Sequence, residues 1–342
     1  MNAPTYRQGL TPFLRDDRAY PGREGPYYPS ASLVAAANAA IILGMPLLLT
    51  GEPGCGKTEF AEAAARALGW PHFTCFVRSD SRARDLIYSY DALRRFGDAQ
   101  HGEGREKQRA RDPRNYIRLE GLGLGLTSNE PCVVLIDEID KAPRDLPNDL
   151  LRELDRSRAD FEIPEIDDAV IADIDRDYKD QPIPTIEGRQ VRHVMQRPKS
   201  APRPLVLITS NIERQLPEPF LRRCLFFHIE FPDAAALIKI IKGRFPKFPE
   251  LLLEQAIDVV LSLRKHYNLT KKPTTAELVS WLEVLQRMYD PNYVQQALAG
   301  VVAKLDREKH APSKDINWTL LPGLPCLLKL DEDLQRVFQK RT

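Results

Sequence analysis

The chain has 342 residues, 43% of them hydrophobic and 28% charged, which is typical of a globular protein with two or three domains or subdomains. A net charge of +1 gives no overall field that would attract nucleic acid or an anionic membrane. Five scattered cysteines form no Cys-x-x-Cys pair, and no apolar stretch is long enough for a secretory signal or a membrane span. These features favour a cytoplasmic protein.

The first 50 residues predict an arm, a helix and a strand. Residues 1–29 are rich in Pro, Gly, Tyr and Arg, and we expect an extended arm. Ser30 or Ser32 is placed to cap a helix over Leu33–Leu43. The apolar run Met45–Thr50 has the length of a buried strand.

A phosphate-binding loop follows directly. Residues 51–58 match G-x-x-x-x-G-K-[ST] without a mismatch, and the helix-favouring run that follows ends before Gly69. In this pattern backbone N–H groups face phosphate oxygens, the lysine adds a cation, and the threonine hydroxyl binds Mg²⁺. The predicted nucleotide-binding residues are Gly51, Glu52, Pro53, Gly54, Cys55, Gly56, Lys57 and Thr58.

The next segment predicts a second strand and an exposed loop. His72–Val77 has strand character, whereas residues 97–115 are charged and poor in apolar side chains, so we expect an exposed loop there. The Gly-Leu repeat within Tyr116–Leu126 is consistent with either a flexible segment or an irregular helix.

Two further strands end in polar residues. The apolar run 132–136 leads into Asp137 and Glu138, as a buried parallel strand does when carboxylates lie at its carboxyl end. Asp137 is expected to hold Mg²⁺ together with Thr58, and Glu138 to polarise the attacking water. The run 205–210 leads into Asn211, a candidate to contact that water or the γ-phosphate.

The remaining chain predicts an insertion, an arginine pair and a helical domain. An acidic and proline-containing stretch at about 160–204 interrupts the alternation of strands and helices. Arg222 and Arg223 form either a surface ion pair or a cation for a nucleotide held by a neighbouring subunit. After Pro232, four segments have helical periodicity, and a tail covers 311–342.

Together these segments resemble an AAA+ ATPase, most closely the MoxR-like branch related to the dynein-type modules. The resemblance spans residues 28–305. Residues 51–58 match the Walker A motif and Val133–Ala142 match Walker B with its Asp-Lys-Ala tail. Ile208–Asn211 match sensor 1, and Leu216–Cys224 resemble the arginine-finger box.

The resemblance implies a parallel α/β P-loop core flanked by helices at 30–232, carrying insertions at about 97–126 and 160–204, and a smaller all-helical lid at 233–310. It implies a ring, usually a hexamer, that hydrolyses ATP with Mg²⁺ between subunits and remodels a partner protein, often one with a VWA domain. The insertion at about 160–204 and the segment Tyr116–Leu126 fall where this branch has pore-facing elements. Glu138 would activate water, Asn211 would act as the sensor, and Arg222 or, in slight preference, Arg223 would act in trans.

One departure limits the resemblance. The segment 271–278 lacks the arginine that the family often has as sensor 2, which leaves Lys271 or Lys272 as substitutes although lysine and arginine bind phosphate differently. A nucleotide-gated switch in a defence or signalling assembly is an alternative, which ATP turnover would separate from a motor. Glu138 and Asn211 argue against a small-molecule kinase, and the near-neutral charge argues against a DNA-dependent motor.

Overall fold

The computed structural model describes residues 13–16, 18–23, 25–155, 160–177, 185–186, 189–197, 201–211, 213–306, 311–312 and 316–339. These described residues leave out 1–12, 17 and 24 of the predicted arm, and 178–184, 187–188 and 198–200 of the predicted insertion. The chain divides into two compact units. The first contains Ser30–Thr50 and Ala61–Phe227, and the second contains Arg18–Pro29, Gly51–Phe60 and the chain from His228 onward.

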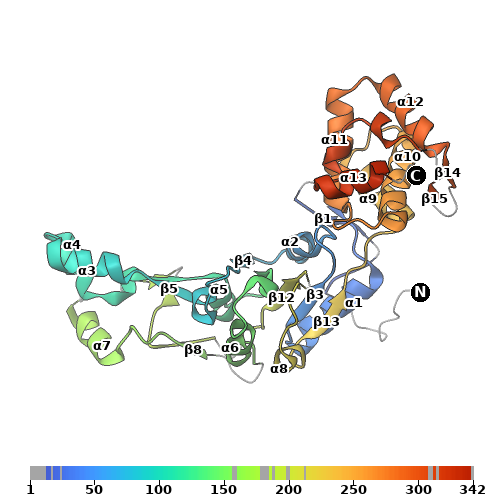
Figure 1. Cartoon of the computed structure of the whole chain (residues 1–342). Helices are drawn as coiled ribbons and strands as arrows, with labels where there is room; N and C mark the ends of the chain where they lie inside the picture. Colours follow the sequence, from blue (N-terminus) through green and yellow to red (C-terminus); the bar gives the residue numbers. More distant parts are fainter. Residues whose placement is uncertain are drawn as a thin grey trace, which may run out of the picture. The chain divides into compact units, whose positions relative to one another are not determined.

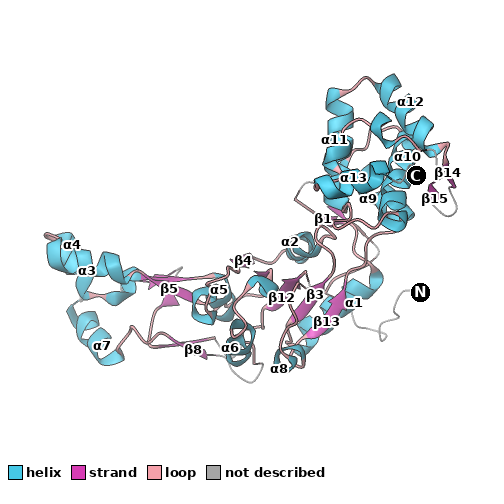
Figure 2. Cartoon of the chain, viewed as in Figure 1, coloured by secondary structure: helices cyan, strands magenta, loops and turns pink. Residues whose placement is uncertain are grey.

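A five-stranded sheet forms the centre of the first unit (Figures 1 and 2). Its strands are β3 (Leu47–Thr50), β4 (His72–Phe76), β7 (Val133–Asp137), β12 (Leu205–Ser210) and β13 (Leu225–His228). They lie in the order β13-β3-β12-β7-β4, and β12 pairs in parallel with both β3 and β7. Residues 133–136 and 205–210 are buried throughout, as expected for parallel strands covered on both faces.

Helices cover this sheet. Helix α1 (Ala31–Leu43) begins at the N-cap Ser30, ends at the left-handed Gly44, and contacts β3 and β12. Helix α5 (Gly121–Leu126) contacts β4 and β7. The further helices of the sheet region are α2 (Lys57–Leu68), α6 (Leu146–Glu153) and α8 (Glu218–Leu221). The predicted α/β fold with a parallel sheet is confirmed.

An extension of the first unit corrects the predicted loop at 97–115. That stretch contains the end of α3 (Ala92–His101) and all of α4 (Arg105–Arg111), which pack against each other. Neighbouring elements are η1 (Ala83–Leu86), η2 (Pro113–Tyr116), α7 (Asp168–Asp177) and the short antiparallel pairs β5–β6 (Tyr88–Tyr90, Ile117–Leu119), β8–β11 (Asp160–Glu162, Val194–Gln196) and β9–β10 (Thr185–Ile186, Arg189–Gln190).

The second unit is mainly helical, as Figure 2 shows by colour. Its elements are α9 (Ala234–Arg244), α10 (Glu250–His266), α11 (Thr275–Met288), α12 (Pro291–Val302), η4 (Trp318–Leu320), η5 (Leu324–Cys326), α13 (Asp331–Gln339) and the pairs β1–β2 (Tyr20–Pro21, Pro26–Tyr27) and β14–β15 (Leu305–Asp306, Ala311–Pro312). Tail residues such as Trp318 and Leu327 join the same hydrophobic core as the fully buried Trp281. Among the described helices, none has the length and apolarity to cross a membrane.

Candidate functional site

The phosphate loop follows β3 and leads into α2. Gly54 and Gly56 have φ values of 72° and 93°, a left-handed conformation that favours glycine. Both also lie tightly against neighbours, because a Cβ on Gly54 would be 2.6 Å from Oγ1 of Thr274 and one on Gly56 would be 3.1 Å from the Tyr27 ring. The loop therefore has the close backbone wrapping, ahead of a helix N-terminus, that suits a phosphate group.

Lys57 lies inside this loop. Its Nζ donates hydrogen bonds of 2.9 Å to the carbonyl oxygens of Gly51 and Glu52, and only 6% of the residue is exposed. Burial raises the pKa of the adjacent Cys55 thiol, although Lys57 acts in the opposite direction. The thiol thus stays neutral, and Lys57 is the cation of the loop. Thr58, in the first turn of α2, is exposed.

The predicted Walker B residues lie at the carboxyl end of β7. Asp137 is the last residue of the strand, and the hydroxyl of Thr209 on β12 donates to its Oδ1 at 2.6 Å. The same hydroxyl accepts the backbone N–H of Glu138 at 2.8 Å. One side chain therefore fixes both acidic residues relative to the neighbouring strand.

Glu138 has a strained backbone. Its φ of 59° and ψ of 52° make it the only non-glycine residue with positive φ among the described residues. Such conformations cost about 1 kcal/mol or more and concentrate at functional sites. The carboxylate pairs with Lys141, with 2.5 Å between Nζ and Oε2, and a hydrogen bond from this pair raises the pKa of Lys141.

Asn211 is positioned by Asp140. The buried carboxylate of Asp140 accepts the backbone N–H groups of Asn211 at 3.0 Å and Glu213 at 3.1 Å through Oδ2. Asp140 lies in the short helix η3 (Ile139–Lys141), directly after Glu138. The structure thus brings Asp137, Glu138 and Asn211 together through Thr209 and Asp140, which lie within the matched motifs but were given no role of their own from the sequence.

The two candidate arginines differ in their partners. Arg222 follows α8 and donates through Nε to Glu218 at 3.1 Å. Arg223 is exposed, and its side chain has no ion-pair partner within the described part of the chain. Arg223 is therefore the less constrained of the two arginines within the described part of the chain.

The sequence suggested Lys271 or Lys272 as the substitute for the sensor 2 arginine, but a different basic residue contacts the phosphate loop. Both lysines are exposed, and the backbone N–H of Lys271 donates to Asp333. Arg264, in the last turn of α10, donates to the Glu52 carboxylate at 2.5 Å. Arg264 lies before the segment in which the family motif was sought, so the motif gave no signal for it.

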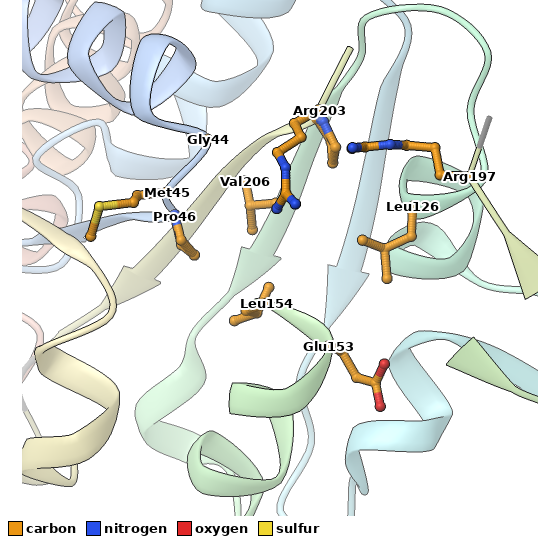
Figure 3. Close-up of a pocket in the computed structure, with 10 residues that line it drawn as sticks. Gly44, Met45, Pro46, Leu126, Glu153, Leu154, Arg197, Arg203 and Val206 are labelled. Carbon is orange, nitrogen blue, oxygen red and sulfur yellow. The ribbon is translucent and has the colours of Figure 1, made fainter. Parts of the chain in front are cut away.

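A small cavity lies at the other edge of the sheet. It is lined by Met45 and Pro46, which precede β3, by Pro204, which precedes β12, and by Arg197, Arg203 and Glu153 (Figure 3). The strands run in parallel, so this is the amino edge, whereas Asp137 and Asn211 lie at the carboxyl edge. The cavity is therefore separate from the predicted nucleotide residues.

Comparisons with known proteins agree with this geometry. Residues 46–166 match the AAA domain of the dynein-related subfamily. Protein NorQ of Paracoccus denitrificans (strain Pd 1222) is 41% identical over 68 residues, which cover 20% of this chain and 25% of NorQ. Protein CbbQ of Allochromatium vinosum is 44% identical over 59 residues, which cover 17% of this chain and 80% of CbbQ. The match thus spans a quarter of the length of one relative and four fifths of the other.

A parallel sheet with a glycine loop after one strand and an Asp-Glu pair after another defines a P-loop nucleoside-triphosphatase fold. The chain belongs to the AAA+ ATPases, in the MoxR-like, dynein-related branch.

Proposed function

We propose that the protein binds ATP with Mg²⁺ and hydrolyses it. The supporting observation is the double contact of Thr209, which holds Asp137 and Glu138 at the edge of the sheet where β3 passes into the phosphate loop. A structural turn has no need for a strained glutamate at that edge, whereas a hydrolytic site needs a carboxylate directed at water.

Each residue has a distinct role in this proposal. Residues 51–56, apart from Pro53, which has no N–H, surround the phosphates with backbone N–H groups, and Lys57 contributes the positive charge. Thr58 and Asp137 are the ligands for Mg²⁺, an ion that is usually bound by few protein oxygens together with phosphate and water. When bound, the ion neutralises charge on the phosphates. Glu138 accepts a proton from the attacking water, and Asn211 contacts that water or the outer phosphate.

Glu138→Gln tests the assignment of the base. The amide keeps the size of the side chain but cannot accept the proton, so kcat is expected to fall by a factor of about 100 or more while ATP binding persists. Phosphate release measures turnover, and a fluorescent ATP analogue measures binding. Hydrolysis at the unmodified rate would show that Glu138 is not the base.

The proposed output is movement of a partner protein by a homo-oligomeric ring. Residues 30–232 would form the nucleotide-binding core and 233–310 the lid, and Arg223 of one subunit would reach the nucleotide of the next. The family resemblance supports chaperone-like remodelling in the cytoplasm, with a VWA-domain protein as the candidate partner. A nucleotide-gated switch is the alternative, with slow turnover that partners do not accelerate.

The two outputs differ in a measurable way. A remodelling motor is expected to raise its turnover when a candidate VWA-domain protein is added, and the Glu138→Gln variant is expected to retain that protein in ATP but not in ADP. Turnover that stays unchanged with the partner bound would favour the switch. Mass photometry in ATP would report the stoichiometry of the ring.

A further inference from the structure

Arg264 has the contacts of a residue with a defined task. Only 9% of its side chain is exposed, although it lies in the last turn of α10. One terminal nitrogen donates to the carbonyl oxygen of Pro273 at 2.5 Å, and the guanidinium carbon lies 3.5 Å from the centre of the Phe231 ring. These two contacts fix the guanidinium plane, because a planar group bound at its edge and stacked on its face has little freedom left.

The remaining terminal nitrogen donates to Glu52. Its distance to Oε2 is 2.5 Å, and the Glu52 side chain is 45% exposed. Glu52 is the second residue of the phosphate loop, and its carbonyl oxygen also accepts a hydrogen bond from Lys57. Arg264 and Lys57 therefore hold the same loop residue, one through its carboxylate and the other through its backbone.

A second contact joins α11 to the loop beside this ion pair. Thr274 directly follows Pro273, caps α11 in a capping box with Glu277, and lies against Gly54. The carbonyl that holds Arg264 and the hydroxyl that meets Gly54 thus belong to adjacent residues. The loop is held at two points, one that depends on charge and one that depends on packing.

An anion in the loop would affect the ion pair between Arg264 and Glu52 more than the packing of Thr274 against Gly54. A phosphate group is a stronger ligand for a guanidinium than a half-exposed carboxylate, because it carries more charge and more acceptor oxygens. Lys57 must also turn from the carbonyl of Glu52 toward a phosphate in order to bind it, which weakens the hold on Glu52. Phosphate in the loop would therefore compete with Glu52 for Arg264.

We propose that Arg264 is the cation through which the helical unit responds to phosphate in the loop, and that Glu52 is its competing internal anion. This inference rests on the proposed nucleotide binding and assigns to Arg264 the role for which the sequence suggested Lys271 or Lys272. Without phosphate, Arg264 holds the loop through Glu52, and when phosphate enters, the guanidinium leaves Glu52 and binds the phosphate.

A double-mutant cycle tests the pair. Removal of the competing charge in Glu52→Gln is expected to tighten the binding of ADP and of a non-hydrolysable ATP analogue about threefold to tenfold. Arg264→Gln is expected to weaken binding about tenfold. In the double variant the Glu52 change should have no further effect, because its influence passes through Arg264. Fluorescent nucleotide titrations of the full chain give the dissociation constants.

Control variants separate this role from general packing. Glu283→Gln makes the same charge change in an exposed ion pair with Arg287 on α11 and should leave nucleotide affinity unchanged. Arg264→Lys keeps a charge but loses the planar contacts, and should recover part of the affinity that Arg264→Gln loses. Lys271→Gln and Lys272→Gln should each change binding less than twofold.

Several outcomes would overturn the proposal. Unchanged or weaker binding by Glu52→Gln would exclude competition, and this exposed substitution gives that answer even if Arg264→Gln fails to fold. An equal effect of Glu52→Gln with and without Arg264 would show that the two residues act independently. If the unmodified protein bound no nucleotide, the proposed function itself would fail, which is a different result from an unmodified protein that binds while the cycle shows no coupling.

Discussion

Thr209 joins two strand ends with one hydroxyl. The group donates to Asp137 and accepts from Glu138, so it fixes a proposed Mg²⁺ ligand and the proposed base in a single geometry. The residue is buried, with 1% exposed, and water cannot replace these contacts easily. Its position two residues before Asn211 was visible in the sequence, but its contact with the neighbouring strand was not.

Thr209→Val is therefore expected to affect turnover more than binding. Valine has the same shape but leaves the N–H of Glu138 and the carboxylate of Asp137 without this partner, a loss of about 1–3 kcal/mol. If that loss falls on the transition state, kcat drops roughly tenfold to a hundredfold. Phosphate-release kinetics with a parallel nucleotide titration measure both quantities.

Thr209→Ser is the matched control, since it keeps the hydroxyl and removes only the methyl group. Its kcat should stay within about a factor of three of the unmodified protein. Equal losses in the valine and serine variants would point to packing of the methyl group instead of the hydroxyl contacts.

The ion pair between Lys141 and Glu138 can also be tested by substitution. The Lys141 ammonium holds the Glu138 carboxylate in an exposed ion pair, and such pairs contribute little to stability. Lys141→Met is expected to free the carboxylate for water and to raise kcat about twofold to fivefold, whereas Lys141→Arg should not. A fall in kcat with Lys141→Met would mean that the pair orients Glu138 for the reaction.

Local sequence predicted the residues whose chemistry depends on their immediate neighbours. The loop 51–58 and the pair Asp137–Glu138 each follow an apolar strand. An apolar strand followed by functional residues can be recognised within one continuous stretch of sequence. Arg264 contacts Glu52, and Asp140 contacts Asn211. Both pairs are far apart in the sequence, so neither periodicity nor motif spacing predicts these contacts. Tertiary structure was needed to find them.

Elements were predictable where burial imposed a pattern. The strands β3, β4, β7 and β12 agree with the sequence to within a few residues, and the four segments with helical periodicity after Pro232 correspond to α9 to α12, because their apolar side chains enter the core. Helix α3 has no buried residue, so the part of it that lies within 97–101 was predicted as a loop. The helix is held by polar contacts instead, such as the bonds from Arg95 to the Ala110 carbonyl and to Tyr90.

The glycine repeat at 121–126 also has a packing reason. A Cβ on Gly123 would lie 2.0 Å from the Ile87 carbonyl oxygen, and one on Gly125 would lie 2.2 Å from a Val134 methyl group. The sequence left open whether this segment is flexible or helical, and the structure shows the helix α5 with its glycines against its neighbours. Glycine is needed at these positions because neighbouring atoms approach the backbone too closely to leave room for a side chain.

Arg114 forms a buried ion pair with Asp112 and a second ion pair that connects it with α7. Arg114 and Asp112 have side chains that are 1% exposed, and Arg114 also contacts Asp175 at 2.7 Å. Arg114→Met is expected to destabilise this region by about 3–5 kcal/mol, because Asp112 would stay buried without its partner. Hydrogen exchange at the amides of α4 and α7 measures the local loss.

Asp175→Asn is the comparison for this prediction. Asp175 is more exposed than Asp112, so its removal should cost about 1 kcal/mol or less. Equal effects of the two substitutions would contradict the assignment of the buried charge to Asp112.

Asp333 on α13 gives a prediction that depends on pH. Burial raises the pKa of this carboxyl, but hydrogen bonds from the N–H groups of Lys271 and Thr270 and the charge of Arg336 outweigh burial and lower it. A lowered pKa in the folded protein means that the carboxylate stabilises the fold above pH 4 and ceases to do so as the pH falls through the lowered value.

Asp333→Asn should therefore be less stable than the unmodified protein at pH 7, by about 2 kcal/mol. The difference should shrink as the pH falls below about 4, because the unfolded chain then takes up a proton that the folded carboxylate binds less readily. Thermal unfolding followed by tryptophan fluorescence reports it, since Trp281 and Trp318 are buried in the same unit. A difference that is constant from pH 7 to pH 3 would argue against a charge effect.

At the scale of the whole molecule, the proposed ring makes each nucleotide site depend on two subunits. One subunit supplies Lys57 and Glu138, and its neighbour supplies Arg223. Loss of an arginine that acts in trans typically lowers phosphoryl transfer about 10³-fold or more, so Arg223→Ala alone should be nearly inactive. Lys57→Ala alone should be inactive because the loop loses its cation.

Mixed rings distinguish action in trans from action in cis. In an equal mixture of Arg223→Ala and Lys57→Ala subunits, about a quarter of the interfaces pair an intact loop with an intact arginine, so turnover should recover to a visible fraction of the unmodified rate. Arg222→Ala, whose arginine already pairs with Glu218, should stay within about tenfold of normal without mixing. If subunit exchange is verified by mass photometry and the mixture stays inactive, Arg223 does not act across an interface, and the ring would have to use another cation.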